Sequence, residues 1–176
     1  MNLIQSREIR SWQAARVLPD LLQSIFTAEL LMPSQELWLV SPWISDIAVI
    51  DNRTGEFNTI VPEWDRVPIR LSQVLCYLAN TSAQINIATR DDEHSQPFFA
   101  AMKDYVCKRT GPIRLLKAPL LHEKGLLARD FYLSGSFNFT YYGITLNEEK
   151  AYFHIDKAIV AENYIAFRER WKSNRT

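Results

Sequence analysis

Three pairs of polar residues lie between positions 122 and 149, and a single residue separates the two members of each pair. The pairs are His122 with Lys124, Ser136 with Asn138, and Asn147 with Glu149. On β-strands, residues i and i+2 point to the same face of the sheet. If the first two segments pair around a turn at Arg129–Asp130, each strand directs two polar side chains to one side. We expect the third pair near the end of the next strand, so that all six groups converge.

These residue types suit an oxyanion whose charge is spread over several oxygens. His122 supplies a nucleophile or base, and Lys124 supplies a point charge. Ser136 and Asn138 supply oriented hydrogen bonds. A carboxylate from Glu149 on the far ring nitrogen of His122 would fix its tautomer and stabilise its cationic form. The pattern therefore predicts a site that binds and attacks such an oxyanion.

Several neighbouring residues bear on this interpretation. Gly135, directly before Ser136, would let the backbone approach a ligand closely. Glu148 competes with Glu149 for the carboxylate role, and the parity of the strand favours Glu149. The alternative for His122 is a satisfied core histidine, which the polar residues at these spacings disfavour.

The other candidate groups carry weaker signals. His94 lies in the acidic segment RDDEHSQ, where a solvated loop is a better interpretation than a metal site, and His154 is expected to face solvent or a strand neighbour. The segment H-E-K lacks the second histidine of the zinc-protease motif H-E-x-x-H. Five aromatic residues fit either core and interface packing or base stacking, namely Trp38, Trp43, Trp64, Tyr141 and Tyr142. The adjacent tyrosines are the best stacking candidates.

The elements that must position these groups alternate along the first two thirds of the chain. Apolar spacing typical of helices is found at 18–31, 67–79, 97–108 and 158–172. Strand patterns are found at 37–42, 84–89, 113–116, 120–129, 131–138 and 149–155. The polar segment 46–65 is expected to form a long loop or small hairpin over the site. Alternating strands and helices followed by a run of strands predict an α/β domain around a mixed sheet.

The composition is that of an ordinary globular domain, with 176 residues, 47% hydrophobic and 23% charged. It favours a single domain over residues 1–176 and disfavours disorder, a coiled coil or a fibrous repeat. No apolar run approaches the roughly 20 residues of a membrane-spanning helix. Charged residues at positions 7, 8 and 10 interrupt the apolar stretch that a signal peptide needs. We expect a cytoplasmic protein with no membrane partner.

Charge and cysteine content narrow the function classes further. Lys plus Arg equals Asp plus Glu at 20 each, which excludes a globally basic nucleic-acid binder but not a local basic groove. Two basic stretches fit either such a groove or a solvated helix face: Lys108, Arg109, Arg114 and Lys117, and Arg168, Arg170, Lys172 and Arg175. Cys76 and Cys107 have no metal spacing, and we expect reduced core thiols, with a single disulfide as the less favoured alternative.

The ordered set H-x-K, G-S-x-N and N-x-E resembles the motif of the phospholipase D superfamily, and the phrase GSFNFT is especially similar to its small bacterial endonucleases. By motif the resemblance covers roughly the last third of the chain. It implies a mixed sheet flanked by helices on both faces, the phospholipase D-like half-domain. Because the chain carries one copy of the motif, it also implies a homodimer whose two copies form one active site at a two-fold axis.

The resemblance also implies a role for each matching residue. His122 of one protomer attacks phosphorus to form a phosphohistidine, and the partner subunit's His122 protonates the leaving oxygen. Catalysis then depends on His122, Lys124 and Glu149, with Glu149 orienting the histidine. Phosphate is held by Lys124, Ser136, Asn138 and Asn147. Neither a metal nor another cofactor is implied.

The sequence departs from the family pattern at one point. The family has Asp five residues after the lysine, where this chain has Arg129 followed by Asp130, and the interval to Gly-Ser is one residue short. We interpret this as a shortened hairpin turn away from the phosphate.

Three functions fit the residue pattern. The favoured one is a metal-independent nuclease, with DNA preferred to RNA as substrate. A lipid or small-molecule phosphodiesterase is the second. The third is a non-catalytic binding or scaffold subunit, and by family analogy a larger defence or DNA-modification complex is a plausible setting.

Overall fold

The structure is a computed structural model that describes residues 5–81, 83–106 and 113–171. Its elements follow one another as β1 (Ser6–Ile9), α1 (Ser11–Leu31), β2 (Glu36–Val40), β3 (Ala48–Asp51), η1 (Glu56–Thr59), β4 (Pro68–Arg70), α2 (Leu71–Asn80), β5 (Gln84–Thr89), η2 (Glu93–Ser95), α3 (Gln96–Val106), β6 (Ile113–Lys117), β7 (Gly125–Ala128), β8 (Phe131–Gly135), α4 (Tyr141–Thr145), β9 (Ala151–His154) and α5 (Lys157–Arg170). Among the described residues, no helix has both the length and the apolar character needed to cross a membrane.

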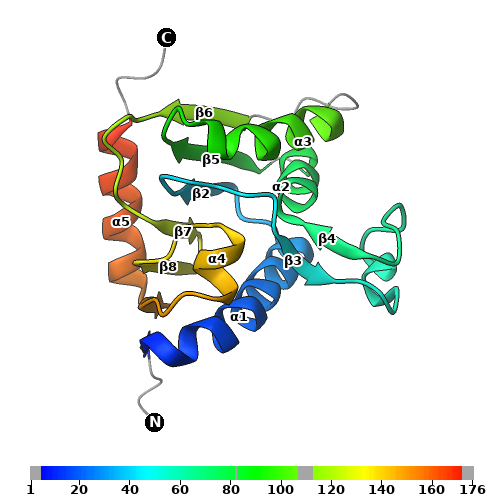
Figure 1. Ribbon diagram of the computed structural model, residues 1–176, viewed down its shortest axis with the longest axis horizontal. Helices are drawn as coiled ribbons and strands as arrows, with labels where there is room; N and C mark the ends of the chain where they lie inside the picture. The colour runs from blue at the N-terminus through cyan, green and yellow to red at the C-terminus, as the bar shows by residue number, and fades with distance from the viewer. Residues whose placement is uncertain (1–4, 82, 107–112, 172–176) are drawn as a thin grey trace.

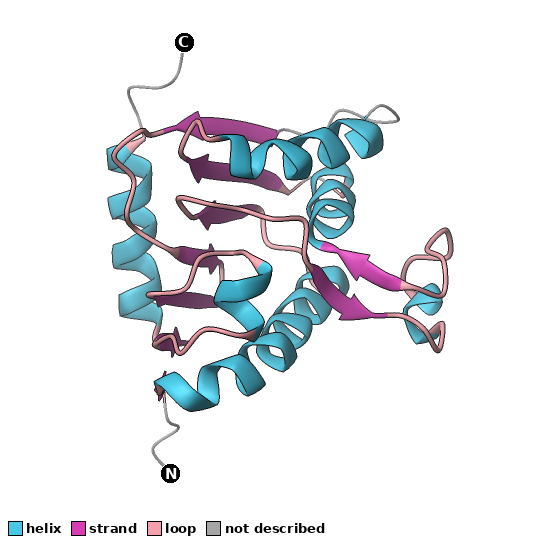
Figure 2. Cartoon of the chain, in the orientation of Figure 1, coloured by secondary structure: helices cyan, strands magenta, loops and turns pink. Residues whose placement is uncertain are grey.

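Seven strands form one mixed sheet in the order β1-β9-β8-β7-β2-β5-β6. β2, β5 and β6 are parallel, whereas β7 runs antiparallel to β2 and the ladder continues antiparallel through β8, β9 and β1. Helix α5 covers one face of the sheet, and α1, α2 and α3 lie on the other (Figure 1). The distribution of helices and strands in Figure 2 gives the same two-sided arrangement. The predicted fold class, a mixed sheet flanked by helices on both faces, is confirmed.

Apolar side chains fill the space on both sides of the sheet. Phe26 of α1 and Leu75 of α2 belong to the larger buried cluster, together with Leu39 of β2. On the opposite face, Trp38 of β2 packs edge-to-face against Phe167 of α5, with ring centroids 5.8 Å apart. A strand covered on both faces needs apolar residues at successive positions, which explains the sequence ELWLV of β2.

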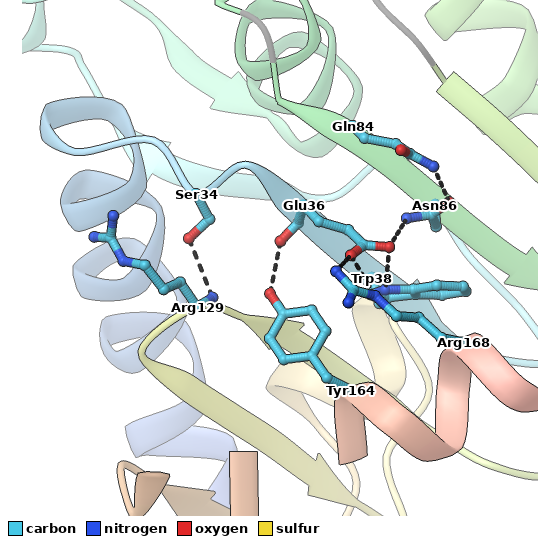
Figure 3. Close-up of polar contacts among 8 residues, drawn as sticks. All are labelled: Ser34, Glu36, Trp38, Gln84, Asn86, Arg129, Tyr164 and Arg168. Atoms are coloured by element: carbon cyan, nitrogen blue, oxygen red, sulfur yellow. Dashed lines mark hydrogen bonds and ion pairs between the residues drawn. The ribbon is translucent and has the colours of Figure 1, made fainter. Parts of the chain in front are cut away.

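A network of polar contacts centred on Glu36 fastens α5 to the sheet (Figure 3). The Glu36 carboxylate accepts hydrogen bonds from Trp38 Nε1 at 3.0 Å and Asn86 Nδ2 at 3.2 Å. Its other oxygen forms an ion pair with Arg168 of α5. The Tyr164 hydroxyl donates to the backbone oxygen of Glu36 at 2.8 Å, so consecutive turns of α5 contact the same strand end.

The N-terminal region differs from the sequence prediction in two ways. Helix α1 begins at Ser11 rather than Leu18, and Pro19 lies inside it. Leu18 is fully buried, and packing of this apolar face outweighs the missing N–H of the proline. Strand β1 was not predicted, because three of its four residues are exposed and show no alternation. Pairing with β9 and a 2.8 Å hydrogen bond between Ser6 Oγ and His154 Nδ1 hold it in place.

The segment 46–65 forms most of a β-hairpin, in which β3 pairs antiparallel with β4. Its tip projects on the side of α1 and α2, away from α4 and α5 (Figure 1). It therefore does not cover the residues near α4, contrary to our expectation. The first residues of the predicted helix 67–79 extend as β4, and α2 begins only at Leu71, because Pro68–Arg70 pair with β3.

Cys76 is a free and buried thiol in α2, as predicted. Its Sγ lies 3.7 Å from the backbone oxygen of Met102, and burial raises the pKa of the thiol to about 11. Some predictions concern residues outside the described part of the chain and stay predictions; these residues are Cys107, Lys108, Arg109, Lys172 and Arg175.

Candidate active site

The three predicted pairs meet at one edge of the sheet, although they lie beside the strands rather than on them. His122 and Lys124 precede β7, the second pair follows β8, and the third pair precedes β9. In the antiparallel ladders the start of β7 faces the end of β8, and the end of β8 faces the start of β9. The predicted turn at Arg129–Asp130 joins β7 to β8. The ladder thus brings the three pairs to a common edge, as the spacing predicted.

The strands are shorter than predicted because the chain makes other contacts at this edge. β7 begins at Gly125, which pairs with Val40, the last residue of β2. After β8 the chain leaves β9, and Phe139 makes an isolated parallel bridge with Ile44. The site residues consequently occupy short connecting segments, which are bound on several sides by neighbouring backbone.

Ser136, Asn147 and Glu149 form a compact polar cluster. The Ser136 hydroxyl donates to one carboxylate oxygen of Glu149, and Asn147 Nδ2 lies 3.4 Å from the other. The Ser136 hydroxyl in turn accepts the backbone N–H of Lys150 at 3.0 Å. Of the two candidate glutamates, Glu149 is the one in this cluster, whereas Glu148 is exposed.

Asn138 lies beside a serine that the sequence analysis did not identify. The Ser41 hydroxyl, directly after β2, donates to the backbone oxygen of Trp43 at 2.8 Å and accepts the backbone N–H of Phe139 at 3.2 Å. It lies 3.5 Å from Asn138 Oδ1. Thr140 then caps α4 by accepting the Gly143 N–H at 3.1 Å. Because Ser41 is fully buried, it fixes the loop after β8 to the end of β2.

Lys124 and His122 lie next to each other, with His122 exposed and Lys124 half-buried. Lys124 Nζ donates to the backbone oxygen of His122 at 2.6 Å. Glu123, between them, is held by Arg170 of α5 through an ion pair at 2.5 Å. The Glu123 carboxylate therefore points to α5 and forms its ion pair with Arg170 rather than with Lys124. The charge of Lys124 is then available to a bound anion.

The structure differs from the expected surroundings of His122. Among the described residues, Glu149 has no hydrogen bond or ion pair with His122, so its orienting role stays a prediction. Instead, Arg90 Nη2 lies 3.0 Å from His122 Nε2, and Arg90 Nε donates to the backbone oxygen of Leu121 at 2.8 Å. Arg90 directly follows β5, whose carboxyl end reaches this edge, where ligands of open α/β sheets bind. The position of Arg90 directly after a predicted strand was the one sequence feature that could have identified it, and this position lies outside the motif.

A second set of contacts surrounds Arg90. Its guanidinium lies over the Trp43 ring, 5.3 Å from the centroid. The His94 backbone N–H and the Trp43 indole N–H, at 3.2 Å, hold the pKa of Asp92 below its usual range. The His94 ring contacts Ser45 Oγ at 3.0 Å. Among the described residues, no cluster of histidine, cysteine and acidic side chains suits a metal ion. Within this segment, Glu93–Ser95 form the 3-10 helix η2, and Glu93 and His94 are exposed.

Gly135 allows a close approach that the sequence analysis did not predict, and its expected approach to a ligand stays a prediction. A Cβ at this position would overlap the backbone oxygen of Lys150, directly before β9, and crowd the ring of Phe137. The glycine therefore permits a close approach between the end of β8 and the residue before β9. This contact lets Ser136 reach Glu149.

The described members of the two basic stretches are mostly engaged with acidic groups. Lys117 pairs with Asp91 at 2.9 Å, and Arg168 and Arg170 pair with glutamates. Arg114 lines a small pocket of about 200 Å³ beneath the end of α5. These contacts favour a structural role over a continuous track for a nucleic-acid backbone.

The chain was compared with known proteins. No family model matches it, and no curated protein sequence matches it. Among solved structures, it is similar to NucT from Helicobacter pylori, with 12% identity, a TM-score of 0.61 and 96% of each chain covered. It is also similar to the phospholipase D family member Nuc from Salmonella typhimurium, with 13% identity, a TM-score of 0.57, and 95% of this chain and 93% of Nuc covered.

A third neighbour is TrmBL2, an archaeal chromatin protein described as having a novel mode of DNA binding, with 15% identity and a TM-score of 0.53. The match covers 98% of this chain but 54% of TrmBL2, so the chain spans about half the length of that protein. The chain therefore has the same fold as NucT and as Nuc, a phospholipase D family member, in agreement with the fold that its motifs predicted.

Proposed function

We propose that this protein is a phosphodiesterase of the phospholipase D type, acting as a dimeric nuclease that cleaves DNA in preference to RNA without a metal ion. One observation carries the proposal. His122, Lys124, Ser136, Asn138, Asn147 and Glu149 gather at one sheet edge. They do so in a fold that this chain has in common with Nuc and NucT.

The proposed reaction has two displacements at phosphorus. In the first, a ring nitrogen of His122 bonds to phosphorus, the bond from phosphorus to the leaving oxygen breaks, and His122 of the partner subunit gives that oxygen a proton. In the second, water attacks phosphorus, the phosphorus–nitrogen bond breaks, and the partner's His122 takes the proton from the water. Lys124 supplies positive charge to the phosphoryl oxygens, and Ser136 and Asn138 supply hydrogen bonds.

Exposed apolar side chains around the site support a two-fold dimer. Leu120 is 90% exposed, Tyr142 is 66% exposed and Leu146 is 55% exposed, and each lies within a few residues of the site in sequence. Large apolar side chains exposed near a site are candidates for a contact with another molecule. A second copy would cover them and would bring the second histidine that the proposed mechanism requires.

A panel of phosphodiesters tests the activity and ranks the substrates. Wild type and His122→Asn would be incubated, with and without excess EDTA, with bis(p-nitrophenyl) phosphate, single- and double-stranded DNA, RNA and phospholipid vesicles. We expect wild type to cleave DNA faster than RNA and to leave the vesicles unchanged, and we expect His122→Asn to be inactive. Cleavage that stops when EDTA is added would contradict the metal-independent mechanism.

A second candidate function is a DNA-binding module without turnover, and the likeness to TrmBL2 favours it. Such a module would serve as a subunit of a larger assembly, such as a defence or DNA-modification complex. The cleavage assay separates the two functions, and electrophoretic mobility shifts check that the variant still binds DNA. His122→Asn would bind DNA as wild type does under either proposal, but only a nuclease would lose a wild-type cleavage activity.

A further inference from the structure

Arg90 is held in place by contacts in three directions. Its Nε donates to the backbone oxygen of Leu121 at 2.8 Å. The guanidinium lies over the ring of Trp43, with 5.3 Å from its carbon to the ring centroid. Nη2 is 3.0 Å from Nε2 of His122. The backbone oxygen and the aromatic ring together restrict the orientation of this half-buried guanidinium, so its Nη2 stays directed at His122.

The chemistry of the guanidinium decides which atom carries the proton between Arg90 and His122. Arginine has only donors and stays protonated in proteins. Nε2 of His122 must therefore accept, and a neutral His122 carries its proton on Nδ1. In this tautomer the lone pair lies on Nε2. That form is the one a nucleophilic histidine needs.

We propose that Arg90 sets the tautomer of His122 and then binds a non-bridging oxygen of the phosphodiester. This proposal rests on the proposed function. When Nε2 bonds to phosphorus, its lone pair is no longer available to Arg90 Nη2, and that N–H turns to a phosphoryl oxygen on the same phosphorus. No proton leaves Arg90 in this exchange. With Lys124, the site then places two positive charges beside the single negative charge of a phosphodiester.

The alternative is a structural role, in which Arg90 only supports the backbone at Leu121. Arg90→Gln removes the charge and the contact with the carbonyl, whereas Arg90→Lys retains the charge without the planar fork. Arg53→Gln is the matched control, since Arg53 is an exposed arginine of the β3–β4 hairpin that pairs with Asp51. Melting temperatures of all variants would show that the fold is intact.

Nitrogen NMR of the free protein tests the tautomer without any need for activity. The chain has three histidines, so labelling histidine with ¹⁵N gives few signals, and His94→Gln and His154→Gln assign them. We expect His122 in wild type to carry its proton on Nδ1 and to show Nε2 as an acceptor. We expect Arg90→Gln to contain a mixture of both tautomers. A proton on Nε2 in neutral wild-type His122 would overturn the proposal.

Kinetics and inorganic phosphate test the second half of the proposal. Loss of a hydrogen bond from a charged donor predicts kcat/KM for bis(p-nitrophenyl) phosphate lower by roughly 10- to 100-fold in Arg90→Gln, with a smaller loss in Arg90→Lys. Phosphate added to the labelled protein should shift the His122 signals more weakly in Arg90→Gln than in Arg53→Gln. An Arg90→Gln protein that matches wild type in spectrum, phosphate affinity and rate would overturn the proposal. If wild type cleaved no phosphodiester, the proposed function would fail, while the NMR measurements would still decide the role of Arg90.

Discussion

At the scale of single residues, Ser136 connects two parts of the site. Its hydroxyl donates to Glu149 and accepts the N–H of Lys150 at 3.0 Å. One oxygen thus fixes a carboxylate and the backbone that leads into β9. Because both partners lose their contact together, a change at Ser136 should affect the whole polar cluster rather than one phosphate contact.

Ser136→Ala should retain the fold and lower kcat/KM by roughly 10- to 100-fold, the expected effect of losing a hydrogen bond to a charged group. Steady-state kinetics with bis(p-nitrophenyl) phosphate measures the effect. Ser24→Ala is the control, since Ser24 is an exposed serine of α1 whose hydroxyl bonds only its own helix, to Asp20. Wild-type kinetics in Ser136→Ala would show that the cluster has no part in turnover.

The buried thiol of Cys76 gives a prediction about pH. Its pKa rises from 9.0 to about 11 on folding, so folding favours the neutral thiol. The resulting stability is fully present below pH 9.0 and is lost as the pH rises through about 11. Because the folded protein buries this thiol and keeps it neutral, Cys76 in a Cys107→Ser background should resist Ellman's reagent at pH 8 until the protein unfolds. Rapid labelling of folded protein would contradict the burial of Cys76.

The end of the sheet at which the motif residues lie could be predicted from sequence, because the segments between them form strands of one antiparallel ladder. His122 and Lys124 precede β7, and Ser136 follows β8. Arg90 could not be found in this way. Its contact with His122 depends on β2, which lies between β5 and β7 in the sheet, and no local pattern reveals that order.

At the scale of elements, the polar network at Glu36 joins α5 to β2. The Glu36 side chain is 14% exposed and its partner Arg168 is 60% exposed. The carboxylate satisfies Trp38 and Asn86 in addition to the arginine. Removal of Glu36 therefore leaves the donors of Trp38 and Asn86 without this acceptor, whereas removal of Arg168 leaves both hydrogen bonds in place.

Glu36→Ala should lower the free energy of unfolding by about 2–4 kcal/mol, because several donors lose their acceptor in a mostly buried place. Arg168→Ala should cost about 1 kcal/mol or less, since a largely exposed cation contributes little to an ion pair. Urea unfolding of both variants measures the difference. Equal losses in the two variants would show that the ion pair, rather than the buried donors, provides the stability.

Elements with strong periodicity were predicted well, and elements set by pairing were not. The boundaries of β5 match the predicted strand 84–89, because Ile85 and Ile87 alternate with polar Asn86 in the pattern of a strand. β1 and β4 are short, and each exists through its pairing partner. The extension of α1 to Ser11 depends on apolar packing, and Pro19 in the sequence argues against a helix that continues through this position.

At the scale of the whole molecule, the proposed active site needs two copies of the chain. Tyr142, near the site, and Ile165, on α5, are exposed to similar extents, 66% and 64%. They differ in the face of the molecule that they occupy. This pair allows the two-fold interface to be tested with substitutions of matched exposure.

Tyr142→Glu should shift the protein from dimer to monomer and abolish cleavage, because a buried charge at the interface opposes association. Ile165→Glu should leave the mass and the rate unchanged. Size-exclusion chromatography with light scattering reports the mass, and the phosphodiester assay reports the rate. A monomeric wild type with full activity would contradict a shared site.

The fold as a whole could be predicted from the order of elements and the motif. The direction in which the 46–65 hairpin projects could not, because that depends on packing of β3 against α1, where Asp51 N–H donates to Gln23 at 2.8 Å. The quaternary arrangement stays a prediction from a single motif copy and an exposed apolar rim.

The central claim is that His122 attacks phosphorus, and a covalent intermediate tests it most directly. Wild type mixed with a phosphodiester in EDTA would be quenched in alkali within one turnover, digested, and analysed by mass spectrometry. The account predicts a phosphoryl adduct on the peptide that contains His122, absent without substrate and absent in His122→Asn. Turnover by wild type with no adduct on His122, together with cleavage by His122→Asn at the wild-type rate, would contradict it.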